Sequence, residues 1–276
     1  MQVEIIDVSS PQWLQTLQNL RHDVYHLPQY LFTEAFRTNS KPEAIFIFEG
    51  EKIFCLPYLL RSYTDLFGKS IILKDCYDIG SPIGYAGFLL NDVAASDPNF
   101  LKAAIEQLII TFQARNVCSA FFRLHPILNQ NINQVLSSEI LQISGETLSI
   151  NLNLSSEEIW RQTRPEHRTS INRCKRNGFT AKIVNYREYI DEFINIYYET
   201  MDRVGAKTYY YFDDKYFRGL MNLNEVIHLC IVEKDNEVAC AGVFTECCGI
   251  IQYHLGATKS QFLKQAPSKL MFDYVR

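Results

Sequence analysis

The sequence predicts an α/β protein with mixed sheets, built as two successive units of similar plan. Its 276 residues are too many for one average domain of ~150 residues. A helix followed by a strand, a polar turn and a second strand occurs twice, around residues 11–60 and around residues 187–245. The copies share little sequence, so a duplicated fold and a chance recurrence of the common hairpin both stay open. We expect the units to span residues 1–147 and 148–276.

Apolar periodicity and end signals locate the elements of the first unit. Ser10 followed by Pro11 is typical of a helix start, and apolar residues recur behind it at helical spacing. A polar turn at 49–52 between two apolar runs predicts a β-hairpin. The other expected elements are a helical stretch at 30–36, a loop-rich segment at 74–90, a helix at 99–115 and a strand at 117–124.

The second unit begins with alternating apolar residues at 148–154, which predict a strand. Two capping boxes follow at 155–158 and 163–166, and the second, capped by Thr163, opens a short helix that ends at Gly178. An amphipathic helix stops at Gly205. The other expected elements are strands at 226–232, 238–244 and 249–255 and a final helix from Pro267.

The final helix is unusually apolar and has no residue that would end it. It carries Leu270, Met271, Phe272, Tyr274 and Val275. Because such a helix needs a partner surface, we interpret the second unit as truncated at its C-terminus. We therefore expect an exposed apolar patch around Leu270, Met271 and Tyr274.

Charge and composition exclude several classes of protein. The 27 basic and 31 acidic residues give a net charge of −4, which excludes a wholly basic nucleic-acid binder. A hydrophobic content of 47% with 21% charged residues is typical of a globular chain. No apolar run reaches the ~20 residues of a membrane span, and the N-terminus lacks the pattern of a signal peptide. We therefore expect a cytoplasmic protein without membrane insertion; the sequence does not predict its oligomeric state.

Cysteines and known motifs give little sign of metal or nucleophilic chemistry. The eight cysteines lack Cys-x-x-Cys spacing and mostly lie in apolar stretches, so we interpret them as reduced structural thiols. A zinc site or a catalytic cysteine is the alternative. The sequence holds no Gly-x-Ser-x-Gly, His-Glu-x-x-His, Walker or Gly-x-Gly-x-x-Gly motif, which disfavours hydrolase, metalloenzyme and Rossmann interpretations, and we expect no metal.

The sharpest local signal is the segment RQTRPEHRTSINRCKR at 161–176, with six Arg or Lys and one Glu. At 100° per residue, Arg164, Arg168 and Lys175 fall within about 40° of one another, and Ile171 lies in the same stripe. Cations that border an apolar face suit phosphate binding, where Arg offers a bidentate fork. The alternative is a solvated helix that balances nearby acids.

Two further segments could contact a ligand. In SPIGYAG at 81–87, two glycines would let backbone approach a ligand while Tyr85 offers a ring and a hydroxyl, although a simple tight turn also explains them. The strand at 252–254, its small-residue end at 256–258 and the helix start at Pro267 could hold a phosphate through free N–H groups. His254 in this strand is either a core histidine or a base.

Seven segments together resemble the FemAB-like branch of the GNAT acyltransferases, over nearly the whole chain and in the right order. They are HDVYHLPQYL (22–31), LPYLLRS (56–62), DIGSPIGYAGFLL (78–90), FFRLHPIL (121–128), HRTSINRCKRNG (167–178), YYETMDRVGA (197–206) and IQYHLGATKSQFLKQAPSKLMFDYVR (251–276). The resemblance implies tandem GNAT-like units. It also implies that Arg168, with Tyr85 and Tyr253, contacts the phosphates and peptide of a precursor.

Fem-type enzymes transfer an amino acid from aminoacyl-tRNA to an amine of a peptidoglycan precursor, and other GNAT relatives use acyl-CoA. The resemblance therefore implies amide formation on an amine of a cell-envelope or polysaccharide precursor, a small-molecule or lipid-linked acceptor. Aminoacyl-tRNA and acyl-CoA stay open as donors, although the net charge of −4 favours the smaller one. We take Glu246, Tyr253 and His254 as catalytic candidates and Arg164, Arg168, Lys175 and Tyr85 as substrate-binding candidates. The alternative function is an inactive, truncated member that only binds the precursor.

Overall fold

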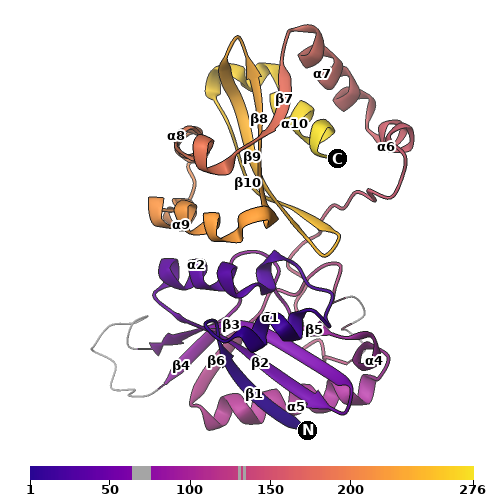
Figure 1. Ribbon diagram of the computed structural model, residues 1–276, viewed down its shortest axis with the longest axis vertical. Coiled ribbons are helices and arrows are strands. Elements are labelled where there is room, and N and C mark those ends of the chain that lie inside the picture. Colours follow the sequence, from indigo (N-terminus) through magenta and orange to yellow (C-terminus); the bar gives the residue numbers. More distant parts are fainter. Residues whose placement is uncertain (64–75, 130–131, 133–134) are drawn as a thin grey trace. The chain divides into compact units, whose positions relative to one another are not determined.

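The computed structural model describes residues 1–63, 76–129, 132 and 135–276. The chain folds as two compact units, Met1–Gly145 and Glu146–Arg276. We call them the N-terminal unit and the C-terminal unit. Each combines helices with one β-sheet of its own (Figure 1). The fold class is therefore mixed α/β with two sheets, as the sequence predicts, and is consistent with tandem GNAT-like units.

The sheet of the N-terminal unit is antiparallel except at one edge. The long hairpin of β2 and β3 forms its centre, where Ile45 pairs with Leu56 and Glu43 pairs with Tyr58. At the edge, β4 and β6 run parallel. In order across the sheet the strands are β1 (Gln2–Asp7), β2 (Lys41–Glu49), β3 (Lys52–Ser62), β4 (Tyr77–Gly80) and β6 (Val117–Phe121), and β5 (Leu89–Leu90) also pairs with β3.

Helices cover both faces of this sheet because alternate residues of β2 point to opposite sides. Ile45 and Ile47 share an apolar cluster with Phe100 of α5 (Pro98–Ala114). Phe46, between them, meets the buried Trp13 edge-on on the other face. Trp13 belongs to α1 (Pro11–Leu17); the remaining helices of the unit are α2 (Pro28–Thr38) and the short α4 (Asp92–Ala95).

The C-terminal unit has an antiparallel sheet in the order β10 (Ile250–Thr258), β9 (Glu237–Cys247), β8 (Ile227–Lys234) and β7 (Thr180–Val184). On one face, α7 (Pro165–Arg176) and α10 (Pro267–Val275) bury Cys174 and Met271 against Cys240 and Phe244 of β9. The helix α8 (Tyr186–Val204) packs against β8, β9 and β10 on the other face. The short helices α6 (Ser156–Gln162) and α9 (Asp214–Gly219) complete the unit.

The strongest local signals of the sequence are confirmed. Ser10 caps α1, and the predicted helix 99–115 is α5. Both helix–hairpin units exist, α2 before β2–β3 and α8 before β8–β9. Gly205 ends α8 in the left-handed conformation, and Ser155 and Glu158 form the predicted capping box.

Two sequence predictions about the C-terminal unit are wrong. The segment 148–154 forms no strand, since no described neighbour pairs with it, and Leu148 is fully exposed. Thr163 does not cap α7, because its hydroxyl donates to the carbonyl of Ile159 one turn back. Arg164 occupies the cap position instead, without a side-chain hydrogen bond to the helix end.

The predicted apolar patch on the last helix is also corrected. Leu270 and Met271 are 4% and 1% exposed, because α10 packs on β8 and β9 within the same unit. Gly242 makes this packing possible, since a Cβ there would lie only 2.8 Å from the sulfur of Met271. Tyr274 alone of the three is exposed, at 51%.

Three strands, β1, β4 and β7, are not evident in the sequence pattern, and each has only four to six residues. The pattern predicts a loop-rich segment at 74–90, yet β4 and β5 lie within it; residues 74 and 75 fall outside the described part. Within the described residues, no helix is long and apolar enough to span a membrane.

Candidate functional site

The basic helix α7 carries the three substrate-binding candidates of the C-terminal unit. Pro165 supplies the first helical position, and Ile171 and Cys174 are buried at 2% and 1% exposure. This buried side packs against α10 and the sheet. The cationic stripe therefore borders the packed side of the helix, as its spacing predicts.

The three stripe cations have different surroundings. The ammonium group of Lys175 lies 2.9 Å from the carboxylate of Asp273 on α10 and 5.9 Å from the ring centre of Trp160. Arg164 is exposed at the N-terminus of the helix. Arg168 is half-buried, and its guanidinium makes no hydrogen bond or ion pair with any described residue. Lys175 thus fastens α7 to α10, while Arg168 keeps its donors available.

A surface cavity of about 480 Å³ lies beside this stripe. It is lined by Thr169, Asn172, Lys175 and Arg176. Arg168 does not line it, so the cavity and the half-buried guanidinium are separate features of the helix. Arg173 lies elsewhere, donating to the carbonyl of Lys264 at 3.1 Å.

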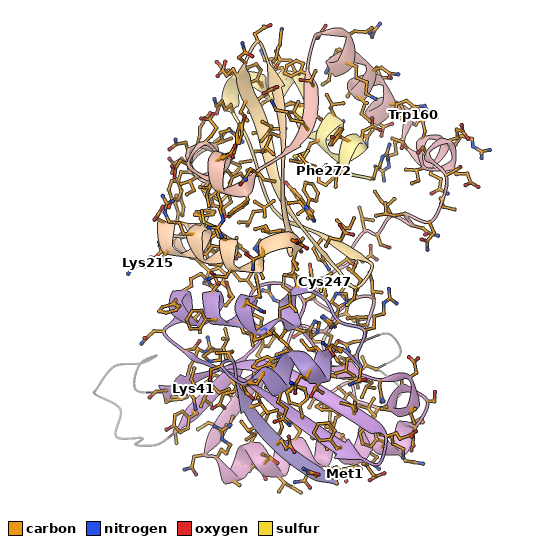
Figure 2. The ribbon with its side chains drawn as sticks, viewed as in Figure 1. Met1, Lys41, Trp160, Lys215, Cys247 and Phe272 are labelled. Atoms are coloured by element: carbon orange, nitrogen blue, oxygen red, sulfur yellow. The ribbon has the colours of Figure 1, made fainter. Side chains whose placement is uncertain are left out.

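Tyr253 of β10 lies on the same face of the sheet as α10. Its ring packs against Phe244 and Phe272, with centroids 5.3 and 4.7 Å away; Figure 2 labels Phe272. The hydroxyl lies over Gly256, where a Cβ would be only 1.6 Å from the oxygen. Burial raises the pKa of Tyr253 to about 12. The phenol is neutral at physiological pH, as it would be at the ordinary tyrosine pKa of 10.0, and can donate a hydrogen bond.

His254 lies on the opposite side of the strand from Tyr253. The register shifts between Tyr253 and Leu255, which leaves His254 as a bulge. Its Nε2 lies 2.9 Å from the hydroxyl of Tyr216, a buried residue of α9 that stacks on Phe212. The helix α9 packs on α8, the helix of the other sheet face. Tyr253 and His254 therefore do not form one cluster.

Glu246 lies near the end of β9. Its side chain is 60% exposed, and its carboxylate lies 3.5 Å from Nε2 of His228. The carboxylate of Glu246 is open to solvent, whereas the Nε2 atom of His228 that faces it is buried.

Tyr85 belongs to the N-terminal unit, whereas the other six candidates belong to the C-terminal unit, and Tyr85 is 36% exposed. The glycines beside it have positive φ of 102° and 61°. A Cβ on Gly84 would lie 2.2 Å from the ring of Tyr25, and one on Gly87 would lie 2.0 Å from Oδ1 of Asn129. The glycines thus admit the protein's own side chains, Tyr25 and Asn129, close to the backbone of this loop.

A network of buried polar groups surrounds this loop, and the sequence pattern does not reveal it. Asp23 and His125 are fully buried, and their Oδ2 and Nε2 atoms are 2.9 Å apart. Nδ1 of His125 accepts backbone N–H groups from Ile127 and Leu128, so Nε2 carries the proton and donates to Asp23. The resemblance segments 22–31 and 121–128 contain both residues, but neither segment shows that they meet.

The same network holds the loop at Ile83. Its N–H donates to the carboxylate of Glu34 at 3.0 Å, and its carbonyl accepts the hydroxyl of Tyr30 at 2.9 Å. Glu34 is itself paired with Arg37 at 2.8 Å. Loops that carry ligand contacts on a rigid scaffold are common in binding proteins. Tyr85 therefore projects from a fixed loop.

A run of exposed aromatic side chains in the C-terminal unit is a further feature that is not among the predicted site residues. Tyr209, Tyr210 and Tyr211 are 51%, 47% and 38% exposed. Tyr211 donates its hydroxyl to Asp202, and Tyr197 of α8 donates to the carbonyl of Tyr210. In the sequence, the run of three consecutive tyrosines is the only sign of this exposed aromatic surface.

The cysteines form no disulfide, and most of them are buried. Burial raises the pKa of Cys230 to about 12 and also raises that of Cys174. A thiol held neutral in this way is a poor nucleophile. These surroundings support the structural role predicted for the buried thiols.

Comparison with known proteins shows the fold. No protein-family model matches the chain, and no curated protein matches it. The crystal structure of FemX is similar over 100% of this chain and 85% of that chain, with a TM-score of 0.71 and 11% sequence identity. The chain therefore has a FemAB-like fold, which confirms the resemblance at the level of the fold.

Two further solved structures are less similar. One is the C-terminal domain of a putative lysylphosphatidylglycerol synthetase from Agrobacterium fabrum, with a TM-score of 0.48, 10% identity and coverage of 94% of this chain and 71% of that chain. The other is a conserved protein of unknown function from Bacteroides thetaiotaomicron, with a TM-score of 0.47, 9% identity and coverage of 98% and 88%.

Proposed function

We propose that this protein is an acyl- or aminoacyltransferase that forms an amide on an amine of a cell-envelope or polysaccharide precursor in the cytoplasm. The FemAB-like fold over the whole chain supports this class of reaction, which the sequence resemblance also implies. Aminoacyl-tRNA and acyl-CoA are the two candidate donors. The observation that carries the proposal is the half-buried guanidinium of Arg168, which has no partner among the residues that the structure describes.

In the proposed reaction, the neutral amine of the acceptor attacks the carbonyl carbon of the donor. The new C–N bond forms, the C–O bond of a tRNA ester or the C–S bond of a thioester breaks, and the amine loses a proton. Alignment of the two substrates and N–H groups facing the oxyanion supply most of the rate. The leaving oxygen or sulfur gains a proton.

Tyr253 suits the proton-donating role in this scheme. Its phenol is neutral at physiological pH, as an ordinary tyrosine is, and the raised pKa of about 12 strengthens this. We assign it to the leaving group or the oxyanion. Glu246, as an exposed carboxylate, is better placed than His254 to accept the proton of the amine, because Nε2 of His254 is already held by Tyr216 on the other face.

Arg168 is proposed to bind a phosphate of the precursor or of the donor. A guanidinium that is partly removed from water gains most from an anion that accepts two of its N–H groups. Arg164, one turn earlier and exposed, adds charge at the edge of the same stripe. Lys175 contributes indirectly, since its ion pair with Asp273 fixes α7 on α10. Tyr85 is a separate candidate contact of the N-terminal unit, through its ring and hydroxyl.

Calorimetric titration with a UDP-linked muropeptide and with CoA tests the Arg168 site. Arg168→Lys keeps the charge but loses the fork, so binding should weaken by about 1–3 kcal/mol. The matched control is Arg176→Lys, the same exchange at an exposed position of the helix. Equal binding by the parent and Arg168→Lys, for both ligands, would show that the stripe is only a solvated surface.

A transfer assay then separates the enzyme from a protein that only binds the precursor. Both candidate donors are supplied with the amine acceptor, and amide formation is followed by mass spectrometry. Tyr253→Phe should lower kcat by about 100-fold with little change in KM, as expected for loss of a proton donor. Precursor binding without transfer by the parent would favour the binding function.

A further inference from the structure

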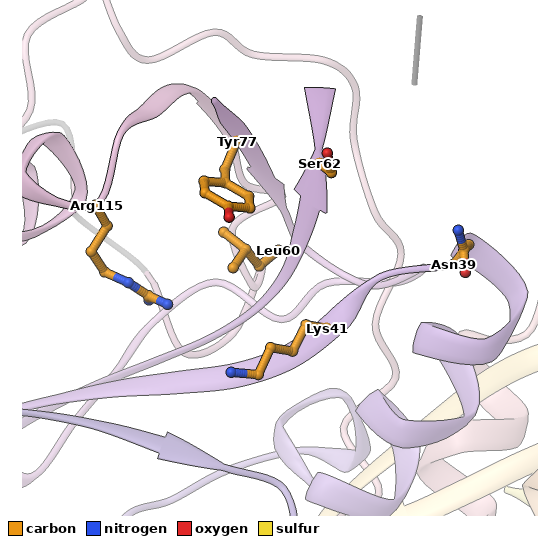
Figure 3. A pocket seen from close by; sticks show the side chains of 6 residues that line it. All are labelled: Asn39, Lys41, Leu60, Ser62, Tyr77 and Arg115. Atoms are coloured by element: carbon orange, nitrogen blue, oxygen red, sulfur yellow. The ribbon is translucent and has the colours of Figure 1, made fainter. Parts of the chain in front are cut away.

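The N-terminal unit contains a cavity of about 480 Å³ that the proposed reaction does not use. It lies at the ends of β2 and β3, on the face of the sheet that α5 covers, and Arg115 directly follows α5. Figure 3 shows the six side chains that line it: Asn39, Lys41, Leu60, Ser62, Tyr77 and Arg115. Its volume is within the range of about 300–1,000 Å³ for small-molecule sites.

A buried carboxylate behind the cavity fixes its two cations. Glu43 is 2% exposed. Its oxygens lie 2.7 Å from the ammonium group of Lys41 and 2.7 Å from the guanidinium of Arg115, and they accept the hydroxyl of Tyr58 at 2.8 Å. Burial opposes ionisation of Glu43, but these hydrogen bonds outweigh it and lower its pKa. Two cations thus share one carboxylate, which leaves one net positive charge.

The cavity also holds more hydrogen-bond donors than the protein uses. Lys41 gives one of its three N–H groups to Glu43, and Arg115 retains its Nε–H and one Nη2–H. The hydroxyls of Ser62 and Tyr77 have no hydrogen-bond partner among the described residues. None of the six lining residues is acidic. In Figure 3 the charged ends of Lys41 and Arg115 are turned toward one another, below the hydroxyl of Tyr77.

We propose that this cavity binds a small organic anion, a phosphate monoester or a carboxylate, whose oxygens lie between Lys41 and Arg115. Oxyanions are the groups that match several converging N–H and O–H donors with one net positive charge. Leu60 and the ring of Tyr77 give the cavity an apolar part, which suits the carbon portion of such a ligand. The site is independent of Arg168, because that residue belongs to the C-terminal unit.

Amide chemical shifts of the isotope-labelled protein, titrated with phenyl phosphate and with benzoate, test the site. Shifts should change at residues 39–41, 60–62 and 77 with at least one probe, and the tighter probe identifies the anion class. Phenol, which lacks the charge, should bind at least tenfold more weakly. Arg168→Lys should leave these shifts and the affinity unchanged, which separates this site from the proposed function.

Substitutions test the role of each charge. Lys41→Gln should weaken binding about tenfold, as expected for a lost charge-assisted contact. Lys102→Gln removes an exposed lysine of the same unit and should have no effect. Glu43→Gln, if it folds, should tighten binding because Arg115 and Lys41 are released to the ligand. Absence of shifts with both anions, equal binding of phenol, or unchanged affinity in Lys41→Gln would overturn the proposal.

Discussion

The two units of this chain are stabilised by different kinds of interior. Among the described residues of the N-terminal unit, three carboxylates are buried, those of Asp23, Glu34 and Glu43, together with His26 and His125. Among the described residues of the C-terminal unit, no charged side chain and no histidine is buried, and the buried polar groups are thiols and hydroxyls, such as those of Thr163, Thr245 and Tyr216. A buried charge is costly unless its partner is fixed. The N-terminal unit therefore adds buried electrostatic pairing to its apolar core, whereas the C-terminal unit depends on apolar packing and keeps its cations at the surface.

The largest expected effect is the loss of Asp23. Asp23→Ala removes the carboxylate that accepts the buried Nε2–H of His125, so the N-terminal unit should lose about 3–5 kcal/mol of stability. Hydrogen exchange at the amides of Ile45 and Phe46 measures the stability of this unit separately from the other. The matched control is Asp191→Ala, which breaks an exposed ion pair with Arg218 in the C-terminal unit and should cost less than about 1 kcal/mol. Equal losses from both variants would show that the two interiors do not differ in this way.

The next effect is a pH dependence confined to the N-terminal unit. Burial lowers the pKa of His26 from 6.5 to about 4. Between these values the unfolded chain binds a proton that the folded chain does not, so stability is full above pH 6.5 and falls as the pH drops toward 4. The loss below pH 4 approaches about 3 kcal/mol.

Denaturant unfolding followed by hydrogen exchange from pH 7 to pH 4 checks this expectation. His26→Asn retains an acceptor near the position of Nδ1 but does not titrate, so its stability should change less over this range. The relevant quantity is the difference in the free energy of unfolding between parent and variant at each pH, because carboxylates titrate in both proteins. Parallel pH profiles would contradict the assignment to His26.

Local sequence patterns predict many of the helices and strands, but they do not predict which buried polar groups contact one another. The hairpin β2–β3 and the helices α5 and α8 follow from periodicity and caps within one segment. The short strands β4 and β7 form because neighbouring strands pair with them. In the segment 148–154 apolar and polar residues alternate as in a strand, but no strand in the described part of the chain pairs with it. Asp23 and His125 are 102 residues apart, so only the folded chain shows that they meet.

For the candidate site as well, local sequence predicts some features and only the folded chain shows the others. Helical geometry alone placed Arg168 at the border of a buried face, and the structure gives that half-buried position. The partner of Lys175 is Asp273, 98 residues later, which no local spacing reveals. Tyr253 and His254 are adjacent in a strand, so alternation alone already directs them to opposite faces. The bulge at His254 and its partner Tyr216, 38 residues earlier, are not visible in the local sequence.

A smaller effect compares two glycines that share a left-handed backbone but differ in surroundings. Gly84 has φ of 102° and the ring of Tyr25 against it, whereas Gly178 has φ of 81° and no described atom within 4 Å of the place that a Cβ would take. Gly178→Ala should cost about 1 kcal/mol from backbone strain alone. Gly84→Ala should cost about 1–2 kcal/mol more, because the Tyr25 ring must move. Hydrogen exchange measures the loss of stability in both variants. Equal losses would mean that the Tyr25 ring moves aside at no cost in free energy.

The smallest effect concerns the thiols, where the two units should behave alike. Cys118 of the N-terminal unit and Cys248 of the C-terminal unit are exposed, whereas Cys55, Cys230 and Cys240 are buried. Burial raises the pKa of each of these three thiols, that of Cys230 to about 12, so they react only when the chain opens. Titration of the native protein with a thiol reagent should therefore modify the two exposed cysteines quickly, and denaturant should make the other thiols accessible to the reagent.

Two variants check this assignment. Cys118→Ser and Cys248→Ser should each remove one rapidly reacting thiol and leave precursor binding within twofold of the parent. Rapid loss of transfer activity on modification of a single thiol would instead indicate a nucleophilic cysteine and overturn both the structural role of the thiols and the direct attack of the amine on the donor.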